Sequence, residues 1–287
     1  MDIRCIDCFQ ASFARLLEKY SLSDEQKMEF WHYFDETTPA CSRFSAPEMQ
    51  VILQKKLKTI SGIEDFYLRE KCDSNNLALS IADYWKEAVK STKNPFAMAV
   101  RLAIAGNIMD YGAANTFNLR KTIEKVMHAK LGIDCSNALA DRVQSARKIL
   151  YLGDNAGEIV FDKLLIATMQ HPDLTFVTRG GPTLNDVTLK DAHEVRMQDV
   201  AQVISSGLDA PTTLLSQSSQ SFRDHFQAAD LIISKGQGNL EGLIDLKDPR
   251  IYFLLMAKCR VMAERLGVEV NDFVIYNAAT NHVKSSC

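Results

Sequence analysis

Three short polar segments carry the residue types that bind a metal ion. Asp154 and Asn155 follow one short apolar run, and Asp186 lies after the next. Carboxylate and amide oxygens are hard ligands that suit Mg²⁺, Mn²⁺ or a similar octahedral ion, which keeps open positions for phosphate oxygens. These segments contain no His or Cys, which argues against a zinc site. We therefore predict a divalent-metal site formed by Asp154, Asn155 and Asp186.

The same segments offer positive charge and backbone N–H groups to a phosphate. A helix expected to start at Ala156 would present free N–H groups and the positive end of its dipole, and Gly157 would permit close approach. Lys235 is a compact cation suited to a phosphate, and Gly236 lets neighbouring N–H groups join it. Each segment alone also matches an ordinary turn, so the prediction depends on their agreement. The Lys-Gly-x-Gly spacing fits neither a P-loop nor a dinucleotide fingerprint, and no organic cofactor is expected.

The elements that must position these residues are strands. Short apolar runs at 148–152, 174–178, 231–234, 251–255 and 273–276 alternate with segments of helical periodicity. This alternation predicts a three-layer α/β/α fold with a mainly parallel sheet. In such sheets the ligand crevice lies beyond the carboxyl ends of the strands, where the polar segments fall.

The first half of the chain is expected to be helical. Ser23 with Gln26, and Ser45 with Glu48, match the capping boxes that start helices, and Gly62 should end the second of these. Nothing in this half alternates as a strand would.

Further helices are expected at about 77–90, 95–111, 117–131 and 136–147. We therefore predict an all-helical domain at 1–145 that covers the active site, followed by an α/β catalytic domain at 146–287.

A polar pair within an apolar helix is a second candidate. Asn107 and Asp110 lie three residues apart and so share one helix face. Buried polar side chains must find partners, so the pair either contacts substrate or belongs to a hydrogen-bond network in the core.

Charge and hydropathy argue against a nucleic-acid partner and a membrane partner. The 287 residues contain 33 Lys and Arg against 36 Asp and Glu, which leaves no basic footprint for nucleic acid. The longest apolar stretch, 96–109, contains Arg101 and is shorter than the roughly 20 residues of a membrane helix. There is no signal-peptide pattern and no dense disulfide framework, so we expect a cytoplasmic protein with no membrane partner.

Cys5 and Cys8 form a CxxC motif that the predicted site does not use. Such a pair binds metal, cycles as a dithiol, or simply packs at the start of a helix. Cys72 could complete a metal site if the fold brings it close. The six histidines have no metal-ligand spacing.

The motifs together resemble the damage-control phosphatases, also called the domain-of-unknown-function eighty-nine family. The resemblance is carried by GDNAGE at 153–158, RGGP leading to NDVT within 179–188, and SKGQGN at 234–239. In the helical half it is carried by CIDC at 5–8 and AGNIMDYG at 105–112. The resemblance spans nearly the whole chain and is closest to the stand-alone, cysteine-containing prokaryotic branch.

The resemblance implies a metal-dependent phosphatase of small phosphorylated metabolites. It implies that Asp154, Asn155 and Asp186 hold the ion and that Lys235 holds phosphate. It also implies that Asn107 and Asp110 contact substrate or phosphate, and it includes Glu158 in the signature. One departure is that Asp65-Phe66-Tyr67 lacks the proline that the family usually carries there.

We therefore expect hydrolysis of a phosphomonoester with Mn²⁺, Mg²⁺, Co²⁺ or Ni²⁺. The substrate could be a sugar phosphate, a phosphopantetheine derivative or a damaged nucleotide, and either water or an aspartate could attack. Two alternatives are an S-adenosylmethionine-dependent carboxyl methyltransferase and a non-catalytic phosphometabolite-binding protein. A methyltransferase would need a Gly-rich loop of suitable spacing after the first strand, which this sequence lacks. A non-catalytic binding protein would not need the open metal site that the sequence predicts.

Overall fold

The computed structural model describes residues 1–107 and 116–279. The chain starts with helices, in line with expectation. They are α1 (Arg4–Lys19), α2 (Asp24–Thr37), η1 (Thr38–Arg43), α3 (Ala46–Ser61), α4 (Leu68–Ser91), α5 (Pro95–Ala105) and α6 (Thr116–Met127).

Strands and helices then alternate to the end of the described chain. The elements are β1 (Leu131–Asp134), α7 (Ser136–Ser145), β2 (Ile149–Leu152), α8 (Glu158–Met169), β3 (Leu174–Thr178), α9 (Leu189–Glu194), η3 (Met197–Asp199), β4 (Gln202–Ser205), α10 (Gln220–Ala228), β5 (Leu231–Lys235), α11 (Gly236–Leu243), η4 (Ile244–Leu246), β6 (Ile251–Met256), α12 (Arg260–Leu266) and β7 (Phe273–Asn277).

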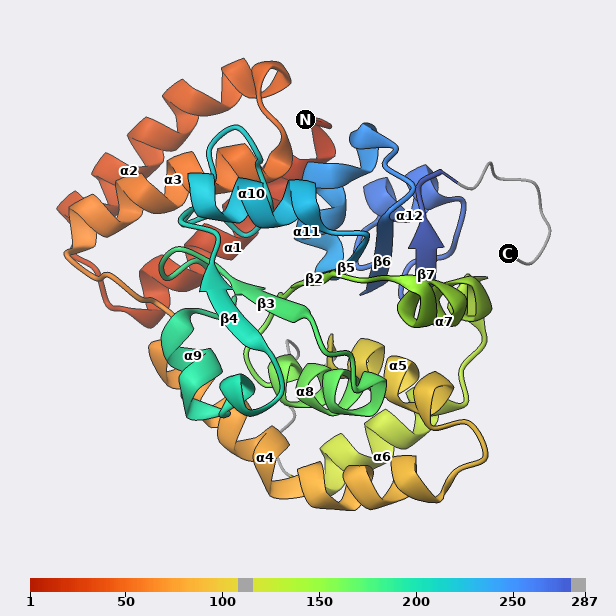
Figure 1. The fold of residues 1–287 in the computed structure, drawn as a ribbon. Helices are drawn as coiled ribbons and strands as arrows, with labels where there is room; N and C mark the ends of the chain where they lie inside the picture. The colour runs from red at the N-terminus through yellow and green to blue at the C-terminus, as the bar shows by residue number, and fades with distance from the viewer. Residues whose placement is uncertain (108–115, 280–287) are drawn as a thin grey trace.

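Within the described residues, seven strands form one sheet in the order β1-β7-β6-β5-β2-β3-β4. All neighbouring strands are parallel except β6 and β7, which are antiparallel, so β1 and β7 run opposite to the other strands. Helices cover both faces (Figure 1). The predicted fold class, a helical region followed by an α/β unit with a mainly parallel sheet, is confirmed.

Local sequence signals explain the first helices. Ser23 and Gln26 form the expected capping box of α2, and Ser45 and Glu48 form that of α3. Gly62 then ends α3 with a φ of 70°, a left-handed conformation that glycine adopts without a Cβ clash.

Strands β1 and β4 were not expected. Both lie at the edges of the sheet and are short and partly exposed, so neither has the continuous apolar run of a buried strand. Because β1 falls at 131–134, the stretch expected to be entirely helical contributes one strand to the sheet. The domain division near residue 145 stays a prediction.

The two sheet faces pack against different helices. Side chains of β2 alternate between them: Ile149 and Tyr151 join a core with α4, α5 and α8, whereas Leu150 and Leu152 join a core with α10, α11 and α12. A separate apolar cluster holds α1, α2 and α3 together. The first core therefore joins helices from the N-terminal half to the sheet.

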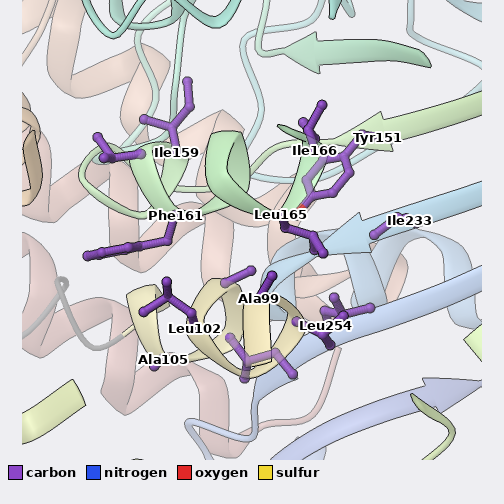
Figure 2. Close-up of a cluster of buried hydrophobic side chains, with 14 of the residues drawn as sticks. Ala99, Leu102, Ala105, Tyr151, Ile159, Phe161, Leu165, Ile166, Ile233 and Leu254 are labelled. Carbon is purple, nitrogen blue, oxygen red and sulfur yellow. The ribbon is translucent and has the colours of Figure 1, made fainter. Parts of the chain in front are cut away.

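Helix α5 packs directly against α8 (Figure 2). Phe161 and Leu165 of α8 point toward Ala99 and Leu102 of α5, and all four side chains are fully buried. This contact places the end of α5, and with it Asn107, beside the first turn of α8. In the part of the chain that the structure describes, no helix is long and apolar enough to span a membrane.

We predict that Phe161→Ala lowers the free energy of unfolding by about 3–5 kcal/mol, because it leaves a cavity between α5 and α8. Urea unfolding followed by circular dichroism would measure the change. Leu79→Ala on α4 is the control, since Leu79 is 41% exposed, and it should change the free energy by less than about 0.5 kcal/mol. Equal effects of the two substitutions would contradict this packing.

Candidate functional site

The candidate site lies at the carboxyl ends of β2, β3 and β5. Strand β2 pairs with β3 on one side and β5 on the other, so the chain changes direction across the sheet at this point. Loops that leave neighbouring strands in opposite directions open a crevice, and ligands of open α/β sheets bind there. The loops after these strands contain the predicted site residues.

Backbone hydrogen bonds bring the loops after β2 and β3 together. Asn155 and Asp186 form an isolated antiparallel β-bridge. The Val187 N–H donates to the Asp154 carbonyl oxygen over 2.8 Å, and the Ala156 N–H donates to the Asn185 carbonyl oxygen over 2.9 Å. The structure thus places Asp154, Asn155 and Asp186 side by side, although the last is more than thirty residues away in sequence.

Arg179 links the two aspartates. Its Nε donates to Asp186 Oδ2 over 2.6 Å, and its Nη2 lies 3.3 Å from Asp154 Oδ1. Its Nη1 donates to Asn239 Oδ1 over 2.7 Å, and its side chain is 3% exposed. Arg179 starts the RGGP motif but was not among the residues predicted to form the site. Its position directly after a buried strand was the available signal.

The two carboxylates leave excess negative charge in a buried place. Burial raises the pKa of Asp154 well above its usual value, and the charges of Asp186 and Glu158 raise it further. The positive charges of Arg179 and Lys258 lower that pKa, but it stays well above its usual value. An added cation would relieve this repulsion, so the donor set suits a metal ion.

Asn155 completes the donor set. Its Nδ2 donates to Asp154 Oδ2 over 2.7 Å and to Glu158 Oε2 over 3.2 Å, so its Oδ1 is the atom that could bind a cation. An amide oxygen is needed here, since the described residues contain no group of three or more His, Cys, Asp or Glu that could hold a metal. Two carboxylates and one amide oxygen are hard ligands, as expected for Mg²⁺ or Mn²⁺.

Gly236 permits the close approach of α11 to Asp154. It has a φ of 79°, and a Cβ placed on it would lie 1.9 Å from Asp154 Oδ2. No other residue fits this position without displacing the carboxylate. The expected glycine-rich turn after β5 is in fact the start of helix α11, because the positive φ of Gly236 turns the chain directly into it.

Lys235, at the end of β5, is held by two buried carboxylates. Its side chain is fully buried, and its Nζ donates to Glu158 Oε1 and Asp162 Oδ1, each over 2.5 Å, and to the Ala103 carbonyl oxygen over 3.0 Å. Among the described residues that line the site cavity, Lys235 is absent. The two carboxylates hold the ammonium group in this arrangement, and contact between Lys235 and phosphate stays a prediction.

Glu158 connects this lysine to the predicted metal ligands. It is fully buried and accepts hydrogen bonds from Lys235, from Asn155 and from Asn107 Nδ2, the last over 2.9 Å. Asn107 is also fully buried and therefore belongs to the site network rather than to solvent. Asp110, its predicted companion, lies outside the described residues.

The expectation of free N–H groups at Ala156 is wrong. Helix α8 starts at Glu158, and the Ala156 N–H is already bonded to Asn185. The Gly157 N–H donates to Asn75 Oδ1 of α4 over 2.7 Å. Protein oxygens therefore occupy the donors that we had expected to bind phosphate.

Helices of the N-terminal half hold the site loops. Besides Asn75, Lys58 Nζ of α3 donates to the Pro182 carbonyl oxygen over 2.7 Å, and Thr183 donates to Gln54 over 3.1 Å. The sequence contained no local signal for these contacts, because each joins residues more than eighty positions apart.

A cavity of about 370 Å³ opens above the two aspartates. Its walls come from α1, α3, α11 and the loop before α12. Its polar and thiol lining includes Asp154, Asn155, Asp186, Cys5, Cys8, Gln237, Glu241, Lys258 and Cys259. The volume suits a small metabolite.

The fold and the cavity define an α/β protein with acidic, oxygen-rich loops at the switch point of its sheet, which helices of the N-terminal half contact. Residues 1–274 match the family model described as "Damage-control phosphatase ARMT1-like domain". The chain belongs to this family, as the resemblance indicated.

Relatives agree with this assignment. An uncharacterized protein of Methanocaldococcus jannaschii is 38% identical over 237 residues, covering 79% of this chain and 78% of its own. A protein of Pyrococcus horikoshii named damage-control phosphatase is 36% identical over 211 residues, covering 72% of each. A crystal structure of a DUF89 family protein from P. horikoshii matches with a TM-score of 0.87 and 29% identity, covering 97% of this chain and 99% of that one.

Asp162 provides a measurable electrostatic signature next to the site. It accepts from Lys235 and, over 2.7 Å, from the Tyr151 hydroxyl. Burial raises its pKa to about 7, although Lys235 opposes this shift. The folded protein therefore keeps a proton on Asp162 that the unfolded chain loses near the ordinary pKa of 3.8, so this group's contribution to stability falls as pH rises toward 7.

We predict that Asp162→Asn flattens the pH dependence of the unfolding free energy between about pH 5 and 7, removing a slope of about 1 kcal/mol per pH unit. Urea unfolding at several pH values would measure it. Asp83→Asn, at an exposed position of α4, should leave the slope as it is. An unchanged slope in Asp162→Asn would contradict the raised pKa.

Proposed function

We propose that this protein is a metal-dependent phosphatase that hydrolyses phosphomonoesters of small metabolites. The observation that carries the proposal is the convergence of two buried carboxylates and an amide at the floor of a cavity, at the switch point of the sheet. Membership of a family whose archaeal relatives are named damage-control phosphatases supports the same chemistry.

Asp154, Asn155 and Asp186 would hold the divalent ion, which is Mg²⁺, Mn²⁺, Co²⁺ or Ni²⁺. When bound, such an ion withdraws charge from phosphate oxygens and lowers the pKa of water. The two carboxylates are already oriented, because Arg179 holds both through its guanidinium group. Such preorganisation reduces the rearrangement that binding requires.

Charge in the surrounding residues supports an anionic substrate. Lys258 lines the cavity and acts on Asp154 through its positive charge. Lys235 would act indirectly: it neutralises Glu158, and Glu158 in turn orients Asn155. We assign Lys235 a positioning role, and we assign Asn107 the role of fixing Glu158 from the helical side.

The cavity favours a small phosphorylated metabolite as the partner. Its volume of about 370 Å³ accommodates a phosphate and a compact organic group such as a sugar, a pantetheine fragment or a nucleoside. Polar walls from Gln237 and Glu241 would contact the organic part of the substrate.

We predict that Asp186→Asn lowers metal-dependent release of phosphate from p-nitrophenyl phosphate by about 100-fold or more, because it removes one anionic ligand. The shape and the acceptor for Arg179 remain, so circular dichroism should match the unaltered protein. Asp83→Asn is again the matched control and should retain activity. Undiminished hydrolysis by Asp186→Asn would disprove its role as a ligand.

We further predict that chelation with EDTA abolishes phosphate release and that one of Mn²⁺, Mg²⁺, Co²⁺ or Ni²⁺ restores it. The reason is that Arg179, bonded to both aspartates, balances only one of their two negative charges, and a divalent ion would balance the other and activate the phosphate. A screen of phosphometabolites against each ion would measure both metal and substrate preference. Full activity after chelation, with metal content below stoichiometric levels, would contradict metal dependence.

A further inference from the structure

Thiol groups line the cavity of the candidate site. Cys5 and Cys8 of α1, and Cys259 before α12, form part of the same cavity wall as Asp154 and Asp186. All three cysteines are free in this structure. The proposed phosphatase chemistry uses none of them, so the CxxC motif still needs an explanation.

Cys5 and Cys8 are placed for a disulfide. They lie three apart in the first turns of α1, where residues share one helix face with Cβ atoms about 5–6 Å apart. A disulfide needs Cβ atoms at about 3.5–4.5 Å, so a small local adjustment is required. The Cys5 N–H bonds to the Asp2 carbonyl oxygen, a tight turn at the helix end that can adjust without breaking the helix interior.

The two thiols differ in accessibility. Cys8 is exposed, whereas Cys5 is half-buried. Burial raises the pKa of Cys5 to about 11, and the nearby charge of Glu241 adds to the shift. Cys8 therefore supplies the thiolate that reacts first, and Cys5 supplies the thiol that resolves the product.

Metal ligation by these thiols finds no support in the fold. Cys72, the possible third ligand, lies on α4 and is not among the described residues of this cavity wall. Over residues 1–107 and 116–279, no set of three or more His, Cys, Asp or Glu is arranged to bind an ion. The dithiol alternative is the one that the geometry favours.

We propose that Cys5 and Cys8 form a reversible oxidation site in the wall of the substrate cavity, and that a hydroperoxide is the oxidant. The Cys8 thiolate attacks the peroxide, an S–O bond forms, the O–O bond breaks, and water or an alcohol leaves after protonation. Cys5 then attacks the Cys8 sulfur, the S–S bond forms, and the hydroxyl group leaves as water with the Cys5 proton. Two thiols are oxidised and one peroxide is reduced.

The disulfide would change the cavity wall. Arg4, the residue before Cys5, binds Asp2 and Glu264, with Nη1 at 3.0 Å from Glu264 Oε1. Drawing Cys5 toward Cys8 shifts this anchored turn and removes a thiol from the neighbourhood of Glu241 and Cys259. Oxidation would therefore reshape the wall that the substrate contacts and slow hydrolysis, a consequence that rests on the proposed function.

The test is to treat the full-length protein with hydrogen peroxide and to map its cysteines by mass spectrometry. We expect a Cys5–Cys8 disulfide, with the peptide mass lower by about 2 Da for the two hydrogens lost. Hydrolysis of p-nitrophenyl phosphate should fall and should return after dithiothreitol. Cys8→Ser should form no such disulfide and should keep its own untreated activity after peroxide.

Cys72→Ser is the matched control, because it removes an exposed thiol outside the cavity wall and should behave as the unaltered protein. The proposal fails if Cys5 and Cys8 remain free thiols while Cys72 is oxidised, or if Cys5 links to Cys259 instead. It also fails if the disulfide forms without changing the rate of hydrolysis. The same holds if peroxide removes the same fraction of activity from Cys8→Ser as from the unaltered protein. Should Cys8→Ser fold poorly, Cys8→Ala replaces it.

Disulfide mapping requires no turnover. If the reduced protein hydrolyses no phosphate ester with any of the metal ions, the proposed function fails, whereas the map still decides whether the oxidation site exists.

Discussion

The site depends on keeping two like charges together in a buried place. Asp154 and Asp186 come from different loops and repel each other where water cannot screen them. Arg179 makes this arrangement possible by hydrogen bonding to both, and Asn239 holds the guanidinium in turn. The remaining negative charge supports the proposed cation site, because a bound cation would relieve the repulsion that costs stability.

A second group of buried charges supports the first. This group consists of Lys235, Glu158 and Asp162, and it lies under the cavity floor. Glu158 connects it to Asn155 and Asn107, because it accepts a hydrogen bond from each. Removing one partner of such a group leaves a buried charge uncompensated, which is strongly destabilising. This network also explains why helices from the N-terminal half cannot be regarded as a loose cover: Asn107, at the end of that half's α5, is one of its members.

Much of the fold could be predicted because it follows from local patterns. Capping boxes such as Ser23 with Gln26 identify helix starts, and buried strands such as β2 and β3 appear as apolar runs. Edge strands β1 and β4 were missed because half-exposed strands lack such a run. Asp154, Asn155 and Asp186 were predicted together, since parallel strands place their carboxyl ends at one edge. Arg179, Asn75 and Gln237 were not selected, because their partners are set by how the loops and helices pack in the folded chain.

The sequence by itself determined the buried strands, most helices, the family and the chemical character of the site, because these depend on residue type and spacing along the chain. The tertiary structure decided which of these groups face the cavity and which are bonded to other parts of the protein. It placed Lys235 in a buried ion cluster, bonded the Ala156 N–H to Asn185, and brought Cys5 and Cys8 into the cavity wall. The physical reason is that a side chain's partners are set by packing between distant segments, which no local pattern records.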